Sequence, residues 1–252
     1  LEKGVVMDRD ANSTPISPDS LSGLALWLDA SDINGDGLPN SENNGTQIAI
    51  WKDKSLNDFN ATQDNPDNQP IYVADDGNGK PALGFTNHWL DLNGVDLHAK
   101  EIILAASFFG TNGQSNYCIL GRGGDRGQIR IGNDLKLQKF YLDFAGPENV
   151  QHAYKNSTAS LYFPLNQATV VKAILGDGSQ YGGHFQNMII GRDTHDNNRW
   201  NGYIYEILVF EERLLPWQYL AIEWYLGQKW GVYGPVHGLT AFGVNKQVTD
   251  WG

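Results

Sequence analysis

The chain has 252 residues, one cysteine, 29 glycines and 12% aromatic residues, and its formal net charge is −11. This length suffices for a hydrophobic core without disulfide bonds, and the negative charge argues against nucleic acid and anionic membrane surfaces as partners. No segment approaches the roughly 18 consecutive apolar residues of a membrane-spanning helix, so we expect no membrane insertion. The glycine-rich, aromatic-rich composition predicts short strands joined by turns.

The chain divides into a central globular region and two flanking segments. Residues 1–21 are polar and contain Pro15 and Pro18, so we expect a linker or the edge of a neighbouring domain. One domain is expected over 22–233, followed by an outgoing linker or a neighbouring-domain strand over 234–252. Because the sequence begins Leu-Glu-Lys, we expect a module of a longer multidomain chain, monomeric within it.

The most specific motif is the segment from Asp32 to Glu42, near the start of the domain. Asp32, Asn34 and Asp36 are spaced as in the first half of a calcium loop, and Gly37 follows directly. Ca²⁺ takes about six to eight oxygen ligands from a sharply curved backbone. The Glu that ends an EF-hand loop would fall one position after Glu42. We therefore predict an isolated Ca²⁺ loop on a β scaffold, with Glu42 as a further ligand. The alternative is a metal-free polar turn.

Alternating apolar and polar residues predict a series of short strands, at a spacing typical of a sandwich. Some of these segments are expected to be turns instead. The predicted strands are 25–29, 48–53, 71–74, 82–85, 88–92, 101–109, 117–121, 128–132, 139–144, 161–164, 168–175, 185–191 and 202–210.

A glycine-rich run between two predicted strands is the first candidate ligand loop. Its glycines allow the backbone to approach a ligand closely, and its two guanidinium groups suit carboxylates. No Gly-Lys-Ser/Thr follows, so it is not a phosphate-binding loop of the Walker type. An ordinary hairpin turn is the alternative. The candidate ligand-binding residues are Arg122, Gly123, Gly124, Asp125 and Arg126.

A second candidate loop, 191–200, precedes the last predicted strand. Asp193 and Asp196 are candidate ligands of a second Ca²⁺ ion, and His195 and Asn197 are candidates for contact with a polar ligand. A solvated acidic loop is the alternative. Zinc is not favoured, because no second His or Cys lies at ligand spacing.

One helix is predicted over 216–230. Pro216 suits its first turn, Lys229 suits its C-terminal end, and Gly231 suits its stop. We expect its aromatic stripe to pack on the sandwich as core, and not to form a ligand platform.

Several of these segments together resemble laminin G-like modules of bacterial surface and secreted proteins, which belong to the concanavalin A-like lectin and glucanase class. The resemblance implies an all-β, two-sheet antiparallel jelly-roll sandwich with one C-terminal α-helix. It does not name a ligand, because this fold hosts lectins, glycosidases and interaction modules. The resembling segments are Leu24–Asp32, Trp51–Asn57, Ala61–Gln63, Trp200–Phe210, Leu214 and Tyr225–Gly231.

A narrower resemblance rests on the Asp-Ile-Asn-Gly-Asp-Gly segment at Asp32 and the glycine-rich run at Arg122. Both look like parts of ligand-binding modules in giant RTX adhesins. That resemblance implies capture of the free C-terminal carboxylate of a target peptide through bound Ca²⁺. It also implies an extracellular place on the bacterial cell surface.

A glycosidase is disfavoured by the acidic residues of the last strand. Glu206 and Glu211 are five positions apart, so on a regular strand they point to opposite faces. Without a bulge they cannot flank one glycosidic bond as paired carboxylates must. We expect Glu206 to lie on the sheet surface or to pair with a turn. No catalytic residue is assigned.

The sequence therefore predicts a non-catalytic, Ca²⁺-dependent adhesion module that binds a peptide carboxylate. A carbohydrate-binding module on the same fold is the main alternative, because the extracellular partner could equally be a glycan. A structural spacer and a glycosidase are more distant alternatives.

Overall fold

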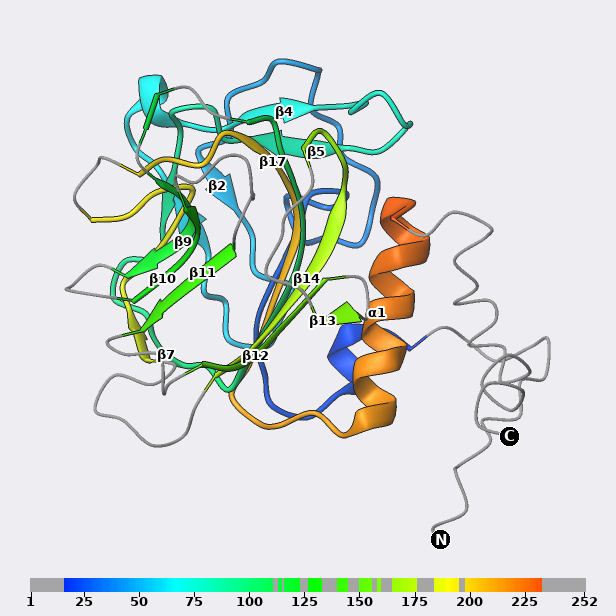
Figure 1. Ribbon diagram of the computed structural model, residues 1–252. Helices are drawn as coiled ribbons and strands as arrows, with labels where there is room; N and C mark the ends of the chain where they lie inside the picture. Colours follow the sequence, from blue (N-terminus) through cyan, green and yellow to red (C-terminus); the bar gives the residue numbers. More distant parts are fainter. Residues whose placement is uncertain are drawn as a thin grey trace, which may run out of the picture.

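The computed structural model describes residues 16–110, 113–114, 116–122, 127–132, 140–144, 150–155, 158–159, 165–175, 184–194 and 198–232. Within these residues the chain forms two large antiparallel sheets and one α-helix, which lies beside one of the sheets (Figure 1). The prediction of an all-β sandwich with a C-terminal helix is confirmed.

The larger sheet has the strand order β13-β12-β14-β8-β17-β5-β4, and β1 also pairs with β17. Its central strands β8 and β17 pair along almost their whole length, from Gly202 opposite Phe108 to Phe210 opposite Glu101. The strands are β1 (Leu24–Asp29), β4 (Ile71–Val73), β5 (Ala82–Gly84), β8 (Glu101–Phe108), β12 (Val150–Lys155), β13 (Thr158–Ala159), β14 (Thr169–Leu175) and β17 (Gly202–Phe210).

The second sheet has the order β11-β10-β9-β16-β6-β3-β2. A separate pair of short strands, β7 (Asp96–His98) and β15 (His184–Gln186), lies outside both sheets. The strands of the second sheet are β2 (Ile50–Trp51), β3 (Ala61–Thr62), β6 (Leu90–Asp91), β9 (Asn116–Arg122), β10 (Gly127–Gly132), β11 (Phe140–Phe144) and β16 (Met188–Ile190). Two 3-10 turns, η1 (Pro18–Ser20) and η2 (Pro66–Asn68), complete the elements besides the helix.

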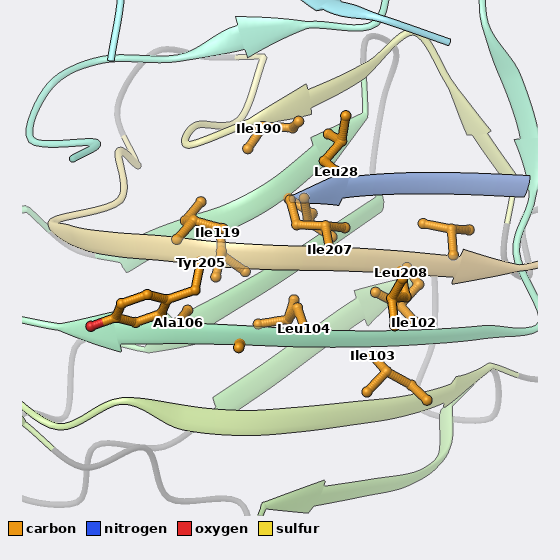
Figure 2. Packing of buried hydrophobic residues seen from close by; sticks show 14 of the residues in the cluster. Leu28, Ile102, Ile103, Leu104, Ala106, Ile119, Ile190, Tyr205, Ile207 and Leu208 are labelled. Atoms are coloured by element: carbon orange, nitrogen blue, oxygen red, sulfur yellow. The ribbon is translucent and has the colours of Figure 1, made fainter. Parts of the chain in front are cut away.

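The core fills the space between the two sheets. Figure 2 shows Leu28 and Ile207 of the larger sheet in one cluster with Ile119 and Ile190 of the second. All eight residues of β8 are buried, because the helix covers part of the face that is turned away from the second sheet. Burial of aliphatic side chains on this scale is the main stabilising contribution to the fold.

The helix α1 (Pro216–Trp230) begins and ends where the sequence predicts. Gly231 ends it in the left-handed conformation, with φ of 65°, which glycine adopts without steric cost. Ile222, Leu226 and Trp230 are buried, and the partly buried Tyr225 packs against the core, so this side of the helix is core. The other two apolar residues of the predicted stripe, Leu220 and Trp224, are only partly buried.

The predicted strands that fall on described residues all contain a strand, so none of these described segments is only a turn. The segment 185–191 is divided into β15 and β16 by Asn187, which has a positive φ of 49°. Sequence reasoning missed β3, β7, β12 and β13. The predicted strand 161–164 lies outside the described residues.

The amino-terminal border of the domain differs in one respect from the predicted one. Pro18 and Leu21 are buried, and Leu21 belongs to the core, so residues just before 22 already pack on the sandwich. Residues 1–15 and 233–252 lie outside the described part. Among the described residues no helix is long and apolar enough to cross a membrane.

Candidate functional site

Asp32, the first residue of the predicted calcium loop, is buried and fully engaged by protein donors. Its Oδ1 accepts the backbone N–H of Asp36 at 3.0 Å, and its Oδ2 accepts that of Gly37 at 3.1 Å. The ammonium group of Lys54 lies 2.8 Å from the same Oδ2. Asp32 therefore closes the turn from inside, with a positive charge already beside it.

Asn34 and Asp36, the next two predicted ligands, form hydrogen bonds within the loop. Asn34 Nδ2 donates to Asp36 Oδ2 at 2.9 Å, and the N–H of Leu38 donates to Asp36 Oδ1 at 2.8 Å. Glu42 is partly buried. Among the described residues no group of three or more His, Cys, Asp and Glu is placed to hold a metal ion. Because the Lys54 ammonium occupies the side of Asp32 Oδ2, a cation bound by that oxygen would have to displace it. Calcium binding here stays a prediction.

Lys54 links this loop to a buried network of charges between the sheet and the helix. Its ammonium lies 2.8 Å from Asp29 Oδ2 as well as from Asp32. Asp29 is shared with the helix, because Lys229 Nζ lies 2.7 Å from Asp29 Oδ2 and 2.9 Å from Glu206 Oε2. Three carboxylates and two ammonium groups thus alternate from the loop through β1 and β17 to α1.

Glu206 is the most deeply buried member of this network, and the expectation that it lies on the sheet surface is wrong. Its side chain has no exposed area. It accepts hydrogen bonds from Trp27 Nε1 and Trp230 Nε1, each at 2.7 Å, and from Tyr225 Oη at 3.0 Å. These donors supply the desolvated carboxylate with the partners that burial requires. Glu206 therefore fastens the helix to the sheet.

The electrostatics follow from three carboxylates sharing two ammonium groups. Burial raises the pKa of Glu206 above its ordinary value, and Lys229 only partly opposes this. Burial acts in the same direction on Asp29, but Lys229 and Lys54 together outweigh it and lower the pKa of Asp29. In Lys54 the effect of burial is outweighed by Asp29 and Asp32 together, and its pKa is raised. Of Asp29 and Glu206, Glu206 is therefore the carboxyl group that takes up a proton first as the pH falls.

The glycine-rich run is described only at its ends. Arg122 is the last residue of β9, where its backbone pairs with Met188 of β16. Gly123, Gly124, Asp125 and Arg126 lie outside the described residues, so their predicted ligand contacts stay predictions.

The loop 191–200 is closed at its base by a β-bridge between Arg192 and Arg199. Inside it Asp193 is buried, and its N–H donates to the carbonyl of Asn198 at 3.3 Å. Asn198 Nδ2 in turn donates to Asp193 Oδ2. Asp193 therefore shapes the loop from inside. His195, Asp196 and Asn197 lie outside the described residues.

The loop 191–200 contacts Gly121. A Cβ at this position would lie 2.4 Å from the carbonyl oxygen of Arg192 and 3.0 Å from Cα of Asp193. The second loop thus packs directly on the end of β9, just before the glycine-rich run, and only glycine permits this approach. The predicted metal loop is elsewhere. In Figure 1 the blue segment after β1 lies on the side of α1, away from the yellow segment around β16.

Sequence reasoning missed the residues on which the second loop rests. Trp89 and Asp91 lie two positions apart and share a face of the second sheet, while Leu90 between them points into the core. The guanidinium carbons of Arg192 and Arg199 lie 3.9 and 5.0 Å from the ring centre of Trp89. The sequence does contain a signal for this face. Trp89 and Asp91 lie two positions apart in a predicted strand, so they are expected on the same side of it.

We refer to this group as the arginine patch, on the outer face of the second sheet. Arg130 belongs to this group because it lies next to Cys118, its partner on the neighbouring strand. The charges of both Arg130 and Asp193 act on the Cys118 thiol, so the two charged groups lie near the same residue. Burial raises the pKa of the Cys118 thiol well above its ordinary value, so the thiol is inert. The patch consists of Trp89, Asp91, Arg130, Arg192, Asp193 and Arg199.

Comparisons with known proteins identify no family. No protein-family model matches the chain, and a comparison with curated proteins found no match. Among solved structures, a Trypanosoma rangeli sialidase with the inhibitor DANA aligns over 83% of this chain at 13% identity, with a TM-score of 0.40. A second structure of that sialidase aligns over 82% at 12% identity, with a TM-score of 0.41. This chain spans about a third of each sialidase chain, 34% and 33%.

Domain 4 of AbnA, a GH43 extracellular arabinanase from Geobacillus stearothermophilus, was solved with arabinotriose. It aligns over 77% of this chain and 95% of its own length, at 15% identity and a TM-score of 0.41. These similarities are too low to carry an argument about function.

Proposed function

We propose that this chain is a non-catalytic ligand-binding module of a large secreted or surface bacterial adhesin, and that it recognises a peptide through its C-terminal carboxylate. The observation that carries the proposal is the packing of loop 191–200 on Gly121, directly before the glycine-rich run, with the guanidinium groups of Arg192 and Arg199 on Trp89 in the same loop. Guanidinium groups bind carboxylates through paired, charge-assisted hydrogen bonds.

Glu206 supports the non-catalytic part of the proposal. A glycosidase needs two carboxylates facing the bond that it cleaves, whereas Glu206 is enclosed by Trp27, Trp230 and Tyr225 beneath the helix. Glu211 is exposed and accepts the N–H of His98 at 2.7 Å. The irregularity in β17 lies between Ile204 and Glu206, so it does not bring the two carboxylates to one face.

A carbohydrate-binding module is the second candidate, favoured by the presence of Trp89 on the outer face of a sheet. Sugar rings bind by stacking on exposed aromatic faces, but Trp89 is only 9% exposed and carries two guanidinium groups. A sugar would have to displace them. The carboxylate therefore fits the described surface better than a neutral sugar does.

The proposed function also keeps Ca²⁺ as a cofactor from the sequence motif at Asp32. Since that loop, in blue, lies apart from the yellow segment that contains loop 191–200 (Figure 1), we expect Ca²⁺ there to stabilise the module without contacting the ligand. Avidity among many copies on a cell would compensate for modest affinity per module.

An array experiment tests the proposal. The domain is applied to peptides of random sequence with a free C-terminus, to the same peptides amidated, and to glycans, each with Ca²⁺ and with EDTA. Binding that is specific for the free carboxylate is expected. Binding of neutral glycans alone would replace the peptide with a sugar as ligand, and hydrolysis of any glycan would refute the non-catalytic assignment. No binding in any arm would leave a structural spacer.

A further inference from the structure

We propose that Lys229 of α1 and Asp29 of β1 condense into an intramolecular amide bond, and that Glu206 of β17 is the catalytic residue that moves the protons. Such a bond is a covalent modification of the fold and needs no ligand. It ties the last element of the domain to its first strand. The distances in the buried network describe the folded chain before the bond forms, so the energies of its ion pairs apply to that state.

Lys229 and Asp29 are already in contact. Lys229 Nζ lies 2.7 Å from Asp29 Oδ2, so the carboxyl carbon that an amine would attack is one bond beyond the oxygen that it touches. Asp29 is buried, and the backbones of β1 and α1 fix the two side chains at their bases. Groups held in this way react as if each were present at about 10⁵–10⁸ M.

Glu206 supplies the proton acceptor that the amine needs. An ammonium group has no lone pair, so it must lose a proton before it attacks a carbonyl carbon. Glu206 Oε2 lies 2.9 Å from Lys229 Nζ. Burial raises the pKa of Glu206, and the charge of Asp29 acts in the same direction. Lys229 opposes both, but its charge disappears with the transferred proton. Since burial disfavours charged groups, the neutral amine and acid become accessible.

Both oxygens of Asp29 have donors for the charge that develops on them. Oδ1 accepts the backbone N–H of Ser31 at 2.9 Å and its hydroxyl at 2.6 Å, and the Lys54 ammonium lies 2.8 Å from Oδ2. An amine that adds to a carboxylate leaves negative charge on both oxygens, which donors already in place stabilise. In Lys54 the effect of burial is outweighed by Asp29 and Asp32, which raise its pKa. Lys54 therefore stays an ammonium and acts as a donor, not as the nucleophile.

Aromatic side chains enclose the site. Trp27 Nε1 and Trp230 Nε1 each donate to Glu206 at 2.7 Å, and Tyr225 Oη donates to it at 3.0 Å. The Lys229 ammonium lies 4.8 Å from the ring centre of Trp230. These rings replace bulk water around the reacting groups, and a site with little water favours a reaction that releases water. Lys229 is partly exposed, so the released molecule has a way out.

The condensation needs no further reactant. Lys229 Nζ passes one proton to Glu206, and its lone pair then forms a bond to Asp29 Cγ. The Cγ–Oδ2 bond breaks, and Oδ2 leaves as water with that proton, returned by Glu206, and with a second proton from Nζ. One proton stays on the amide nitrogen. An ammonium and a carboxylate thus become an amide and water, without oxidation or reduction, and Glu206 is regenerated.

The bond closes a covalent loop from residue 29 to residue 229, which contains nearly all the described residues. A force applied to the two ends of the chain then passes through the bond, and the sheets within the loop are not pulled apart. This protection would suit a module of a surface adhesin. That consequence rests on the proposed function, whereas the bond itself does not.

The test is the mass of the intact chain under denaturing conditions, followed by tryptic digestion. We expect the folded and stored chain to be lighter by one water molecule than its sequence requires. Trypsin should fail to cleave after Lys229, and the peptide that contains Asp29 should remain joined to that segment. The full mass in the folded, stored chain would overturn the proposal. Water loss without joined peptides, as from a succinimide at Asp36, would also overturn it, and so would a link to Lys54 in place of Lys229.

Variants assign the roles. Lys229→Arg keeps a positive charge but has no nucleophilic amine, so it should keep the full mass. Glu206→Gln removes the proton acceptor, and freshly synthesised chain should condense about a hundredfold more slowly, as for loss of a general acid–base group. Lys52→Arg is the matched control, because Lys52 is a lysine outside the network, and it should lose water as the unsubstituted chain does.

Circular dichroism establishes whether each variant is folded. A folded Lys229→Arg chain that still loses water would overturn the proposal, and a folded Glu206→Gln chain that condenses at an unchanged rate would refute the role of Glu206. If Glu206→Gln fails to fold, the masses of the unsubstituted chain and of Lys229→Arg still decide whether the bond exists. Peptide binding on the array without any water loss would leave the proposed function intact and refute the bond.

Discussion

Lys229→Met is the sharpest test of how the helix is held on the sandwich. In the folded chain the Lys229 ammonium lies 2.7 Å from Asp29 and 2.9 Å from Glu206, and its side chain is 20% exposed while Glu206 has no exposed area. Removing one partner of a buried ion pair costs about 3–5 kcal/mol, because it leaves an uncompensated charge. Asp29 keeps Lys54 and Glu206 keeps its neutral donors, so we expect about 3 kcal/mol, near the lower limit.

The pH dependence of this loss follows from Glu206. Its pKa is raised by burial in the folded chain, and loss of Lys229 raises it further. In the window above the ordinary carboxyl pKa the folded variant binds a proton that the unfolded chain does not bind, so its stability falls as pH rises through that window. The variant should therefore lose less stability relative to the unsubstituted chain at about pH 5 than at about pH 8.

Urea denaturation at both pH values measures the effect, and thermal melts should show a decrease of roughly 6–12 °C at the higher pH, for a domain of this size. Lys52→Met, a lysine outside the network, is the control and should change little. A loss below about 1 kcal/mol for Lys229→Met at both pH values, the level of a surface ion pair, would refute the buried network.

Two further predictions concern the loops. Gly121→Ala would place its Cβ 2.4 Å from the carbonyl oxygen of Arg192. We therefore expect it to lower the free energy of unfolding by about 1–3 kcal/mol and to weaken carboxylate binding. Gly84→Ala is the control in urea denaturation, because its nearest atom would be 3.6 Å away, and equal effects would contradict the packing of loop 191–200 on Gly121. Millimolar Ca²⁺ should raise the melting temperature by linkage, and Asp32→Ala with Asp36→Ala should abolish the rise. No rise in the unsubstituted chain would refute the calcium loop.

The fold could be predicted from sequence because its signals are local. Nearly continuous apolar runs within 101–109 and 202–210 mark the central strands. Pro216 and Gly231 mark the ends of the helix. The missed strands β3 and β7 are only two and three residues long, and the missed six-residue strand β12 (Val150–Lys155) mixes polar and apolar residues. They form because a neighbouring strand supplies hydrogen-bond partners for their backbone. Which strand becomes the neighbour is decided by the tertiary structure and not by the local sequence.

The site could be predicted only in part, because its contacts join distant residues. The two loops were found from composition, but the cation–aromatic contacts of Trp89 with Arg192 and Arg199 span more than a hundred positions, and no local spacing indicates them. Glu206 was misplaced for the same reason. A charged residue is usually exposed, and its donor Trp27 is 179 positions away.

The residues that carry the family resemblance explain why it indicates a fold and no ligand. Trp27, Asp29 and Lys54 belong to the opening motifs, and Glu206 and Lys229 to the closing ones. All five meet in the buried network that fastens β1, β17 and α1 together.

These side chains bind one another inside the protein and hold the helix on the sheet. They therefore carry no information about which ligand the protein binds. No residue of the arginine patch belongs to those motifs. Arg199 comes nearest, because it directly precedes the closing motif that begins at Trp200. Ligand specificity in this architecture is therefore expected to follow from the loops on the outer face of the second sheet. Exchange of residues 191–199 should alter binding without altering the helix network.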